Sequence, residues 1–183
     1  MLSQRQGAKG VTLIELMVGI AILTILFGIA VPNFRVWIQN GKVRTAAESI
    51  QNGLQVARVE AIQRNRRVQF DLRDGSSWTV CLQPTPAGSC PDPDGATTIQ
   101  SRSADEGSSD AVTVAVDVGA VPGAVPIVFD SSGRVLTGTV EFVIDTTALV
   151  ADESRELRVI VSPSGSIRMC EDTLPATDLR ACP

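Results

Sequence analysis

Gly10 and Glu15 are the residues whose types and spacing point most directly to chemistry. They bound the run GVTLIE, which follows a short polar segment carrying Arg5 and Lys9. A carboxylate within an apolar helix costs about 2.5–3.5 kcal/mol at the helix centre on insertion scales, so it needs a positive partner at the same depth. Cleavage of the peptide bond after Gly10 creates such a partner, the α-amino group of Val11. If that bond is cut, Glu15 of one chain can pair with the free amine of a neighbouring helix in a bundle.

The segment from Val11 to Val31 predicts a membrane-spanning helix. Glu15 is its only charged residue, and about 20 apolar residues are enough to cross a bilayer. A secretory signal peptide has a shorter apolar core with a cleavage site behind it, which does not fit this run. Because Arg5 and Lys9 precede the span, the positive-inside rule places the N-terminus in the cytoplasm and the rest of the chain outside. A simple signal anchor with an incidental glutamate is the alternative.

The apolar run continues into an amphipathic helix. Pro32 lacks a backbone donor and predicts a kink rather than the end of the helix. Beyond it, small and aliphatic side chains recur at helical spacing and form one apolar stripe. The stripe consists of Val43, Ala47, Ile50, Leu54, Ala57 and Ala61. We expect one helix from about Val11 to Arg66, with its first half in the membrane and its second half packed on a globular head.

Charge is distributed unevenly along the chain. The net charge is -4, but residues 32–67 are mainly basic and the residues from 68 onward are mainly acidic. An acidic head argues against non-specific nucleic-acid binding, because it repels phosphates. Arg64, Arg66 and Arg67 form a basic cluster at the end of the predicted helix, where the helix dipole favours positive charge. A contact surface for an acidic neighbour is the alternative interpretation of this cluster.

From Val68 onward the periodicity becomes that of β-strands. Strands are expected at 68–73, 77–82, 112–116, 126–129, 140–144, 157–161 and 166–170. The first of them alternates apolar and polar residues and is expected to be half-buried. The stretch 83–110 is rich in Pro, Gly, Ser and Asp and predicts a long loop. Ser-Gly pairs in FDSSGRV (129–135) and VSPSGSI (161–167) predict hairpin turns. One long helix followed only by strands predicts an α+β fold, with the helix packed on antiparallel sheet.

The cysteines form two local pairs, Cys81/Cys90 and Cys170/Cys182. Among the connectivities that four cysteines allow, the short loops favour the sequential pairing, and disulfides presume an oxidising compartment. A zinc site is the weaker hypothesis. The spacings are longer than zinc sites use, and histidine, the common co-ligand, is absent from the sequence.

Few patterns in the sequence support catalysis. There is no histidine, no Gly-x-Ser-x-Gly elbow and no phosphate loop, and closure of both cysteine pairs leaves no free thiol. The DPDG segment (92–95) is a weak candidate for a calcium turn, because no bidentate glutamate follows at the EF-hand position. We therefore expect a protein that is not an enzyme and that holds no cofactor or metal.

The N-terminal segment resembles the leader and first helix of type IV pilins and of type II secretion pseudopilins. The resemblance implies cleavage after Gly10 by a prepilin peptidase, methylation of the new N-terminus, and a role for Glu15 in guiding entry into a growing filament. That family usually has Phe at the first mature position, where this chain has Val11. The resemblance also implies that other pilins or pseudopilins are the partners of this chain. It implies that the chain lies in the bacterial inner membrane before assembly, and that its periplasmic head later joins the pilus or pseudopilus.

Three further segments resemble the GspH/FimT group of minor pilins and pseudopilins: LQVARVEAIQRN (54–65), IVFDSSGRV (127–135) and SPSGSIRMC (162–170). The resemblance implies a long N-terminal helix packed on an antiparallel β head of two sheets. We accordingly expect a leader (1–10), a transmembrane and assembly helix (11–31), an amphipathic helix (32–67) and a β-rich head (68–183).

Some FimT-like relatives bind DNA through a Gly-Arg-x-Arg motif just before such a C-terminal cysteine. Here the corresponding residues are GSIR (165–168), so Arg168 matches the second arginine of the motif and the first arginine is missing. Arg180, later in the chain, is the candidate to replace the missing arginine in part. Acidic residues in the same loop oppose DNA binding. The expected function is that of a minor pilin that initiates or caps a type IV pilus. A type II secretion pseudopilin and a DNA-binding tip subunit are the alternatives, and the disulfide-closed tail favours the pilus.

Overall fold

The structure is a computed structural model that describes residues 10–91, 95–106, 108–118 and 126–182. The chain divides into two compact units, Met1–Trp37 and Ile38–Pro183. One long helix, α1 (Leu13–Arg64), begins in the first unit and continues in the second. We call the second unit the head.

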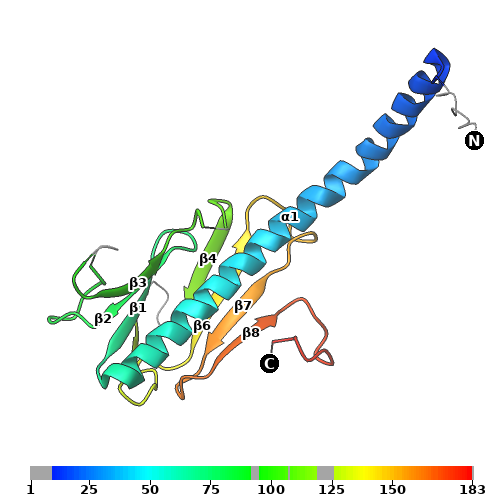
Figure 1. Cartoon of the computed structure of the whole chain (residues 1–183). Coiled ribbons are helices and arrows are strands. Elements are labelled where there is room, and N and C mark those ends of the chain that lie inside the picture. The colour runs from blue at the N-terminus through cyan, green and yellow to red at the C-terminus, as the bar shows by residue number, and fades with distance from the viewer. Residues whose placement is uncertain (1–9, 92–94, 107, 119–125, 183) are drawn as a thin grey trace, which may run out of the picture. The chain divides into compact units, whose positions relative to one another are not determined.

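The head contains eight strands in two antiparallel sheets (Figure 1). The strands are β1 (Val68–Leu72), β2 (Trp78–Leu82), β3 (Thr98–Arg102), β4 (Val112–Asp117), β5 (Ile127–Phe129), β6 (Val140–Thr146), β7 (Leu157–Val161) and β8 (Ile167–Glu171). One sheet has the order β3-β2-β1-β5 and is called sheet A. The other has the order β4-β6-β7-β8 and is called sheet B.

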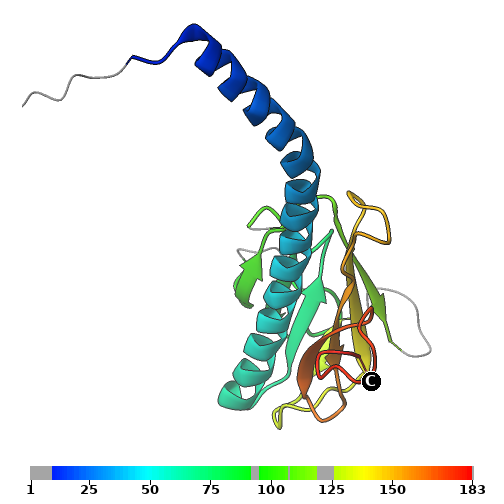
Figure 2. The ribbon, with the colours of Figure 1, turned by 90° about the vertical axis from the view of Figure 1, so that its right-hand side faces the viewer.

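The head part of α1 lies along the strands and supplies one side of the core (Figures 1 and 2). Every residue of the predicted apolar stripe is fully buried, from Val43 to Ala61. The two sheets meet the helix in one cluster of buried side chains, in which Phe70 of β1 and Phe142 of β6 pack edge to face at 5.9 Å. The predicted α+β fold, a long helix packed on two antiparallel sheets, is thus confirmed.

Sheet A approaches α1 unusually closely at Gly53. A Cβ atom at this position would lie 2.8 Å from a ring carbon of Phe70 and 2.9 Å from the indole of Trp78. The indole nitrogen of Trp78 donates a hydrogen bond of 2.8 Å to Ser49, one turn earlier on the helix. Glycine in the middle of a helix costs about 1 kcal/mol relative to alanine, and here it makes room for two aromatic rings.

Two expectations about sheet A were wrong. The predicted loop 83–110 contains β3, which pairs with β2 through a register shift at Val80/Cys81. The first strand is buried on both faces rather than on one, since Gln69 is 1% and Asp71 is 8% exposed. These outward-facing polar side chains are covered, and the segment that covers them is the loop closed by the Cys81–Cys90 disulfide.

Polar side chains of β1 and of the turn after it hold this loop in place. Gln69 donates hydrogen bonds of 2.8 Å to the Asp71 carboxylate and 2.7 Å to the carbonyl of Gly88. The Asp71 carboxylate also accepts a hydrogen bond from the backbone N–H of Cys90. Arg73 donates to the carbonyls of Cys90 and Pro91, both at 2.8 Å. Buried polar groups need such partners, so the loop and the outer face of sheet A stabilise one another.

Asn40 fastens the loop between β6 and β7 to the helix. Its amide nitrogen donates to the carbonyl of Glu153 at 2.9 Å, and its amide oxygen accepts from the backbone N–H of Arg155 at 2.9 Å. Both polar atoms of this one side-chain amide therefore bridge segments that are far apart in the sequence.

Replacement of Asn40 with alanine is expected to destabilise the head by about 1–2 kcal/mol, because two hydrogen bonds are lost at a half-buried site. Hydrogen exchange of the full-length protein in mild detergent would measure this loss of stability. Faster exchange of the backbone N–H of Arg155 would show that the bridge itself is lost. Asn40→Asp keeps the acceptor but loses the donor, so it should give an intermediate loss. Unchanged exchange at Arg155 in the alanine variant would contradict the bridging role.

Candidate functional site

Thr12 sets the start of α1, and Glu15 lies in its first turn. The Thr12 hydroxyl accepts a hydrogen bond of 3.3 Å from the N–H of Glu15, and the Thr12 carbonyl accepts one of 3.2 Å from Leu16. This is the N-cap geometry, and Thr-x-x-Glu is the sequence of a capping box. Glutamate in the first turn also suits the helix dipole. The sequence interpretation of Glu15 overlooked this local role, which the Thr-x-x-Glu spacing would have indicated.

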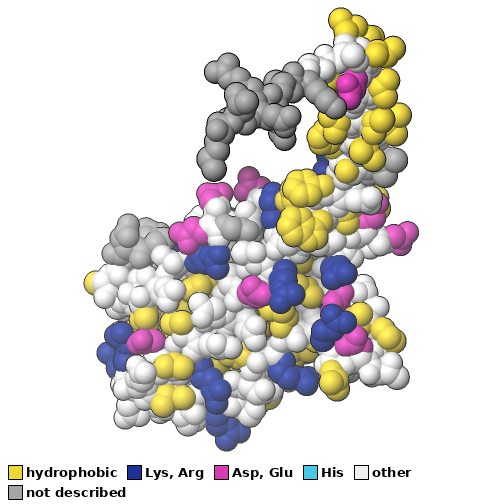
Figure 3. Space-filling view, turned by 45° about the vertical axis from the view of Figure 1, so that its right-hand side comes forward, with side chains coloured by type: hydrophobic (Ala, Val, Ile, Leu, Met, Phe, Trp, Pro, Cys, Tyr) yellow, Lys and Arg dark blue, Asp and Glu magenta, His cyan; other side chains and the backbone are white. Residues whose placement is uncertain are grey.

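The first turns of α1 expose apolar side chains on all sides. Leu13 is 77% exposed, Ile25 66% and Phe27 63%, and Figure 3 shows this band of hydrophobic side chains on the N-terminal part of the helix. A helix that is apolar all round requires lipid or other helices as its surroundings. By length and composition, no single helix in the described part of the chain qualifies as a membrane span. Leu13–Gly28 and Asn33–Arg64 qualify only together, as a bent pair.

The processing and kink residues keep the status of predictions. Gly10 is exposed, and a Cβ there would meet no atom within 4 Å. Residues 1–9, most of the predicted leader, lie outside the described residues. The backbone of α1 continues through position 32, so the helix does not end at Pro32, and the kink stays a prediction.

Two glycine turns pack against the last turns of α1. Gly133 and Gly165 both have positive φ, 78° and 80°, and a Cβ at Gly133 would lie 2.8 Å from Ile62. The turns also contact each other, because the N–H of Val135 donates to the carbonyl of Pro163 at 3.1 Å. The sequence predicted both turns but not their contact. The Nε of Arg58 is buried beside them without a hydrogen-bond partner among the described residues.

Both cysteine pairs are closed as disulfides, Cys81–Cys90 and Cys170–Cys182. The second one ties the C-terminal tail to β8. The tail also pairs with the strand end directly, since the N–H of Glu171 donates to the carbonyl of Arg180 at 2.8 Å. The tail therefore continues sheet B through one parallel bridge, between Glu171 and Ala181.

Arg168 and Arg180, the two arginines predicted as a possible DNA-binding pair, differ in their surroundings. Arg168 is exposed on β8. Arg180 is held by Asp178 at 2.9 Å, and its hydrogen bonds lower the pKa of Asp178 from 3.8 to about 2. Nearby, Arg158 is surrounded by three carboxylates, those of Glu141, Glu156 and Asp172. Arg158 and Arg180 therefore have acidic surroundings, which oppose phosphate binding.

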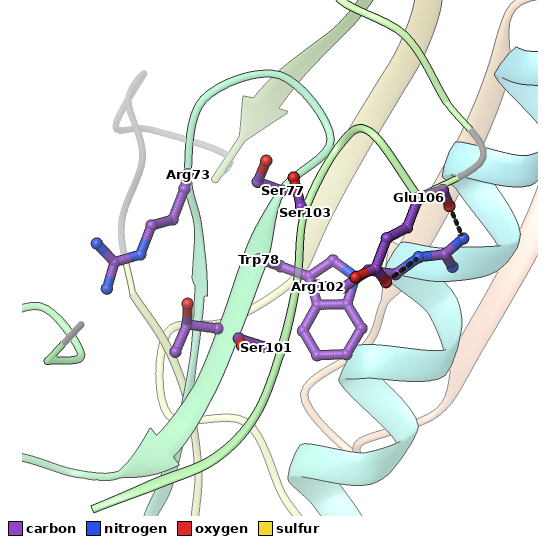
Figure 4. Close-up of a pocket in the computed structure, with 8 residues that line it drawn as sticks. Arg73, Ser77, Trp78, Ser101, Arg102, Ser103 and Glu106 are labelled. Carbon is purple, nitrogen blue, oxygen red and sulfur yellow. Dashed lines mark hydrogen bonds and ion pairs between the residues drawn. The ribbon is translucent and has the colours of Figure 1, made fainter. Parts of the chain in front are cut away.

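One cavity of about 290 Å³ lies at the β2–β3 side of sheet A (Figure 4). It is lined by Arg73, Ser77, Trp78, Thr79, Ser101, Arg102, Ser103 and Glu106. Its two arginines are engaged, Arg73 with backbone carbonyls and Arg102 with Glu106. The lining has no histidine or thiol to act as base or nucleophile. Among the described residues no group of His, Cys, Asp or Glu is arranged to hold a metal ion. The DPDG segment, the weak candidate for a calcium turn, has three of its residues, 92–94, outside the described part.

Comparisons with known proteins agree with this architecture. The model of the family described as type II transport protein GspH matches residues 46–165, and the prokaryotic N-terminal methylation motif matches residues 5–31. The comparison with curated proteins gives no match.

Solved structures of two relatives share the fold. The type IV minor pilin FimU of Pseudomonas aeruginosa matches with a TM-score of 0.51 and 20% identity, covering 74% of this chain and 90% of that one. The minor pseudopilin EpsH of the Vibrio cholerae type 2 secretion system matches with a TM-score of 0.51 and 15% identity, covering 73% and 99%. The GspH family model covers more than half of the sequence. The chain therefore belongs to the GspH family and has the fold of minor pilins and pseudopilins.

Proposed function

We propose that this protein is a minor pilin, a structural subunit that helps to initiate or cap a type IV pilus. One observation carries the proposal. An N-terminal methylation motif continues directly into a helix whose first turns expose apolar side chains on all sides, and the later part of this helix packs on a GspH head. A prepilin peptidase cleaves the chain after Gly10. The new N-terminus at Val11 is methylated, and other pilins pack against the exposed helix.

Before assembly the apolar helix anchors the chain in the bacterial inner membrane, with the N-terminus in the cytoplasm and the head in the periplasm. Support comes from Arg5 and Lys9 ahead of the span, and from two disulfides, which require an oxidising compartment. The role we propose is structural rather than catalytic, in line with the family of structural subunits that the chain matches.

A pseudopilin of a type II secretion system is the second candidate, and the description of the matching family favours it. The disulfide-tied tail at Cys170–Cys182 favours the pilus by analogy alone. A DNA-binding tip subunit is less well supported, because Arg180 is already paired and acidic side chains surround Arg158.

Deletion of the gene, followed by complementation, distinguishes the candidates. A minor pilin predicts loss of surface pili with normal secretion of exoproteins, and a pseudopilin predicts the reverse. If both pili and secretion are normal in the deletion strain, the filament role is wrong. A gel shift of DNA by the full-length protein at physiological salt, lost in Arg168→Ala, would favour the tip subunit instead.

Glu15→Gln is expected to leave cleavage intact and to reduce filament incorporation at least about tenfold, because the amine of a neighbouring chain loses its charged partner. Glutamine serves a capping box as well as glutamate does, so the helix start is preserved. Immunoblots of membrane and sheared-filament fractions measure cleavage and incorporation separately. Thr12→Ala removes the cap but keeps the carboxylate and should assemble far better. Normal incorporation of Glu15→Gln would show that Glu15 acts only as a cap.

A further inference from the structure

Two aromatic side chains, Phe34 and Trp37, are exposed on α1 where its apolar run ends. We call them the aromatic pair. They lie one turn apart on the helix and stack with their ring centroids 5.8 Å from each other, and they are 58% and 71% exposed. Within the described residues the indole N–H of Trp37 donates no hydrogen bond. The aromatic pair therefore requires surroundings that the described chain does not supply.

The apolar run ahead of the aromatic pair is bounded by two charged residues, Glu15 and Arg35. Arg35 comes 20 residues after Glu15, which corresponds to about 30 Å along a helix. The hydrocarbon core of a bilayer is also about 30 Å thick. Inside the run, the hydroxyl of Thr24 donates to the helix carbonyls of Ile20 and Ala21 at 3.1 and 2.8 Å, so it needs no partner from its surroundings. In a membrane, the two charged residues would therefore lie at the two boundaries of the hydrocarbon core.

The chemistry of the aromatic pair fits the headgroup layer of a membrane better than the hydrocarbon core or a second helix. Hydrocarbon would leave the indole N–H of Trp37 without an acceptor, whereas the headgroup layer offers water, carbonyl and phosphate oxygens. Aromatic side chains with one polar edge concentrate at this level. Helices that pack on each other in membranes use small residues at their contacts, and two stacked rings prevent such close approach. Arg35 forms no ion pair in the described part of the chain and is free to bind lipid phosphates.

We propose that Phe34, Arg35 and Trp37 anchor α1 in the periplasmic headgroup layer before assembly, with lipid as their partner. The inference rests on the membrane anchoring that is part of the proposed function. It has a consequence for Glu15, which then lies at the cytoplasmic boundary, where water and not hydrocarbon surrounds the carboxylate. A single chain therefore stays in the membrane without a buried unpaired charge, which would be costly. Glu15 enters apolar surroundings only when a neighbouring subunit supplies its amine.

Tryptophan fluorescence measures the depth of this anchor, because the only other tryptophan, Trp78, is buried in the head. The full-length protein is inserted into vesicles of phosphatidylethanolamine and phosphatidylglycerol whose acyl chains carry bromine either near the headgroup or near the terminal methyl. We expect the shallow bromine to quench Trp37 more strongly than the deep bromine does. Leu26→Trp in a Trp37→Phe background is the matched control. Position 26 lies about 17 Å nearer the start of the helix, so this probe should be quenched mainly by the deep bromine.

Replacement of both rings tests whether the aromatic pair sets the depth of the helix. In Phe34→Ala with Trp37→Ala the helix loses its anchor, so a Leu26→Trp probe should lose its selectivity for the deep bromine. Phe34→Tyr with Trp37→Tyr keeps two aromatic rings with polar edges, and the same probe should remain selective. Both backgrounds lack Trp37, so the probe is read in the same way in each.

Three results overturn the inference. They are stronger quenching of Trp37 by the deep bromine, no quenching of Trp37 in chains that float with the vesicles, and equal selectivity of the Leu26→Trp probe in the alanine and tyrosine variants. Quenching of Trp37 that disappears as the protein-to-lipid ratio rises also counts against lipid, because the rings then pack on a second copy. A chain that does not float with the vesicles contradicts the membrane anchor itself. Failure of the filament role alone appears in the deletion strain and leaves the vesicle result unchanged.

Discussion

Replacement of Gly165 with alanine is expected to destabilise the head by at least about 3 kcal/mol. The residue has a φ of 80°, and its Cβ would be driven into the backbone carbonyl of Gly133, with Arg58 Nε 3.0 Å away. The turn has little room to move, because its N–H donates to Ser162 at 2.8 Å and Val135 bonds to Pro163. The clash therefore separates the two glycine turns from each other and from the end of α1.

Gly138→Ala is the matched control for this substitution. Gly138 has a φ of 92°, but a Cβ there would meet nothing within 4 Å, so only the backbone strain of about 1 kcal/mol remains. Thermal unfolding of the detergent-solubilised protein, followed by fluorescence, should show a fall in Tm of roughly 10 °C for Gly165→Ala and of a few degrees for Gly138→Ala. Equal shifts would mean that strain alone, and not the contact between the turns, makes Gly165 necessary.

Gly53→Ala is expected to cost about 2–3 kcal/mol, although the same substitution in most helices is stabilising. The new methyl group would lie 2.8 Å from Phe70 and 2.9 Å from Trp78, and both aromatic side chains are fully buried, at 0% and 1% exposure. Relief of the contact requires sheet A to move away from α1, which weakens the hydrogen bond between Trp78 and Ser49.

Gly41 lies on the same helix and is the matched control, because its replacement with alanine should have the opposite effect on stability. A Cβ at Gly41 would meet nothing within 4 Å, so Gly41→Ala should stabilise the helix by about 0.5–1 kcal/mol. Thermal unfolding of the two variants should therefore shift Tm in opposite directions. If Gly53→Ala raises Tm as Gly41→Ala does, the close packing of sheet A on the helix is wrong.

The helix and its buried stripe were predictable because burial leaves a period in the sequence. Val43 to Ala61 recur at helical spacing, and all of these stripe residues are buried. The strand Thr98–Arg102 was not predicted, because it shows no such period. The strand β3 lies at the edge of sheet A and has no fully buried residue, so it shows no alternation between apolar and polar side chains. Its pairing with β2 depends on a contact that the local sequence does not encode.

The candidate site was predictable in its local chemistry but not in its long-range contacts. The resemblance of the segment around Gly10 and Glu15 to pilin leaders indicated processing and assembly, and the methylation motif matches that segment. The charge of the cluster at Arg64 to Arg67 was also visible in the sequence. The contact of the turns at Gly133 and Gly165 with each other and with the end of α1 was not, because it joins segments that are far apart in the sequence.

The covered outer face of sheet A has a consequence for how this sequence tolerates mutation. Gln69 and Asp71 occupy positions that alternate with buried apolar residues, the usual mark of a surface site that accepts many substitutions. In the folded head they are almost completely buried and hold the loop at Gly88 and Cys90. Variation at these two polar positions should therefore be as restricted as variation at Phe70 between them. An engineer who recharged the surface of this protein from its sequence pattern would disrupt the interior instead.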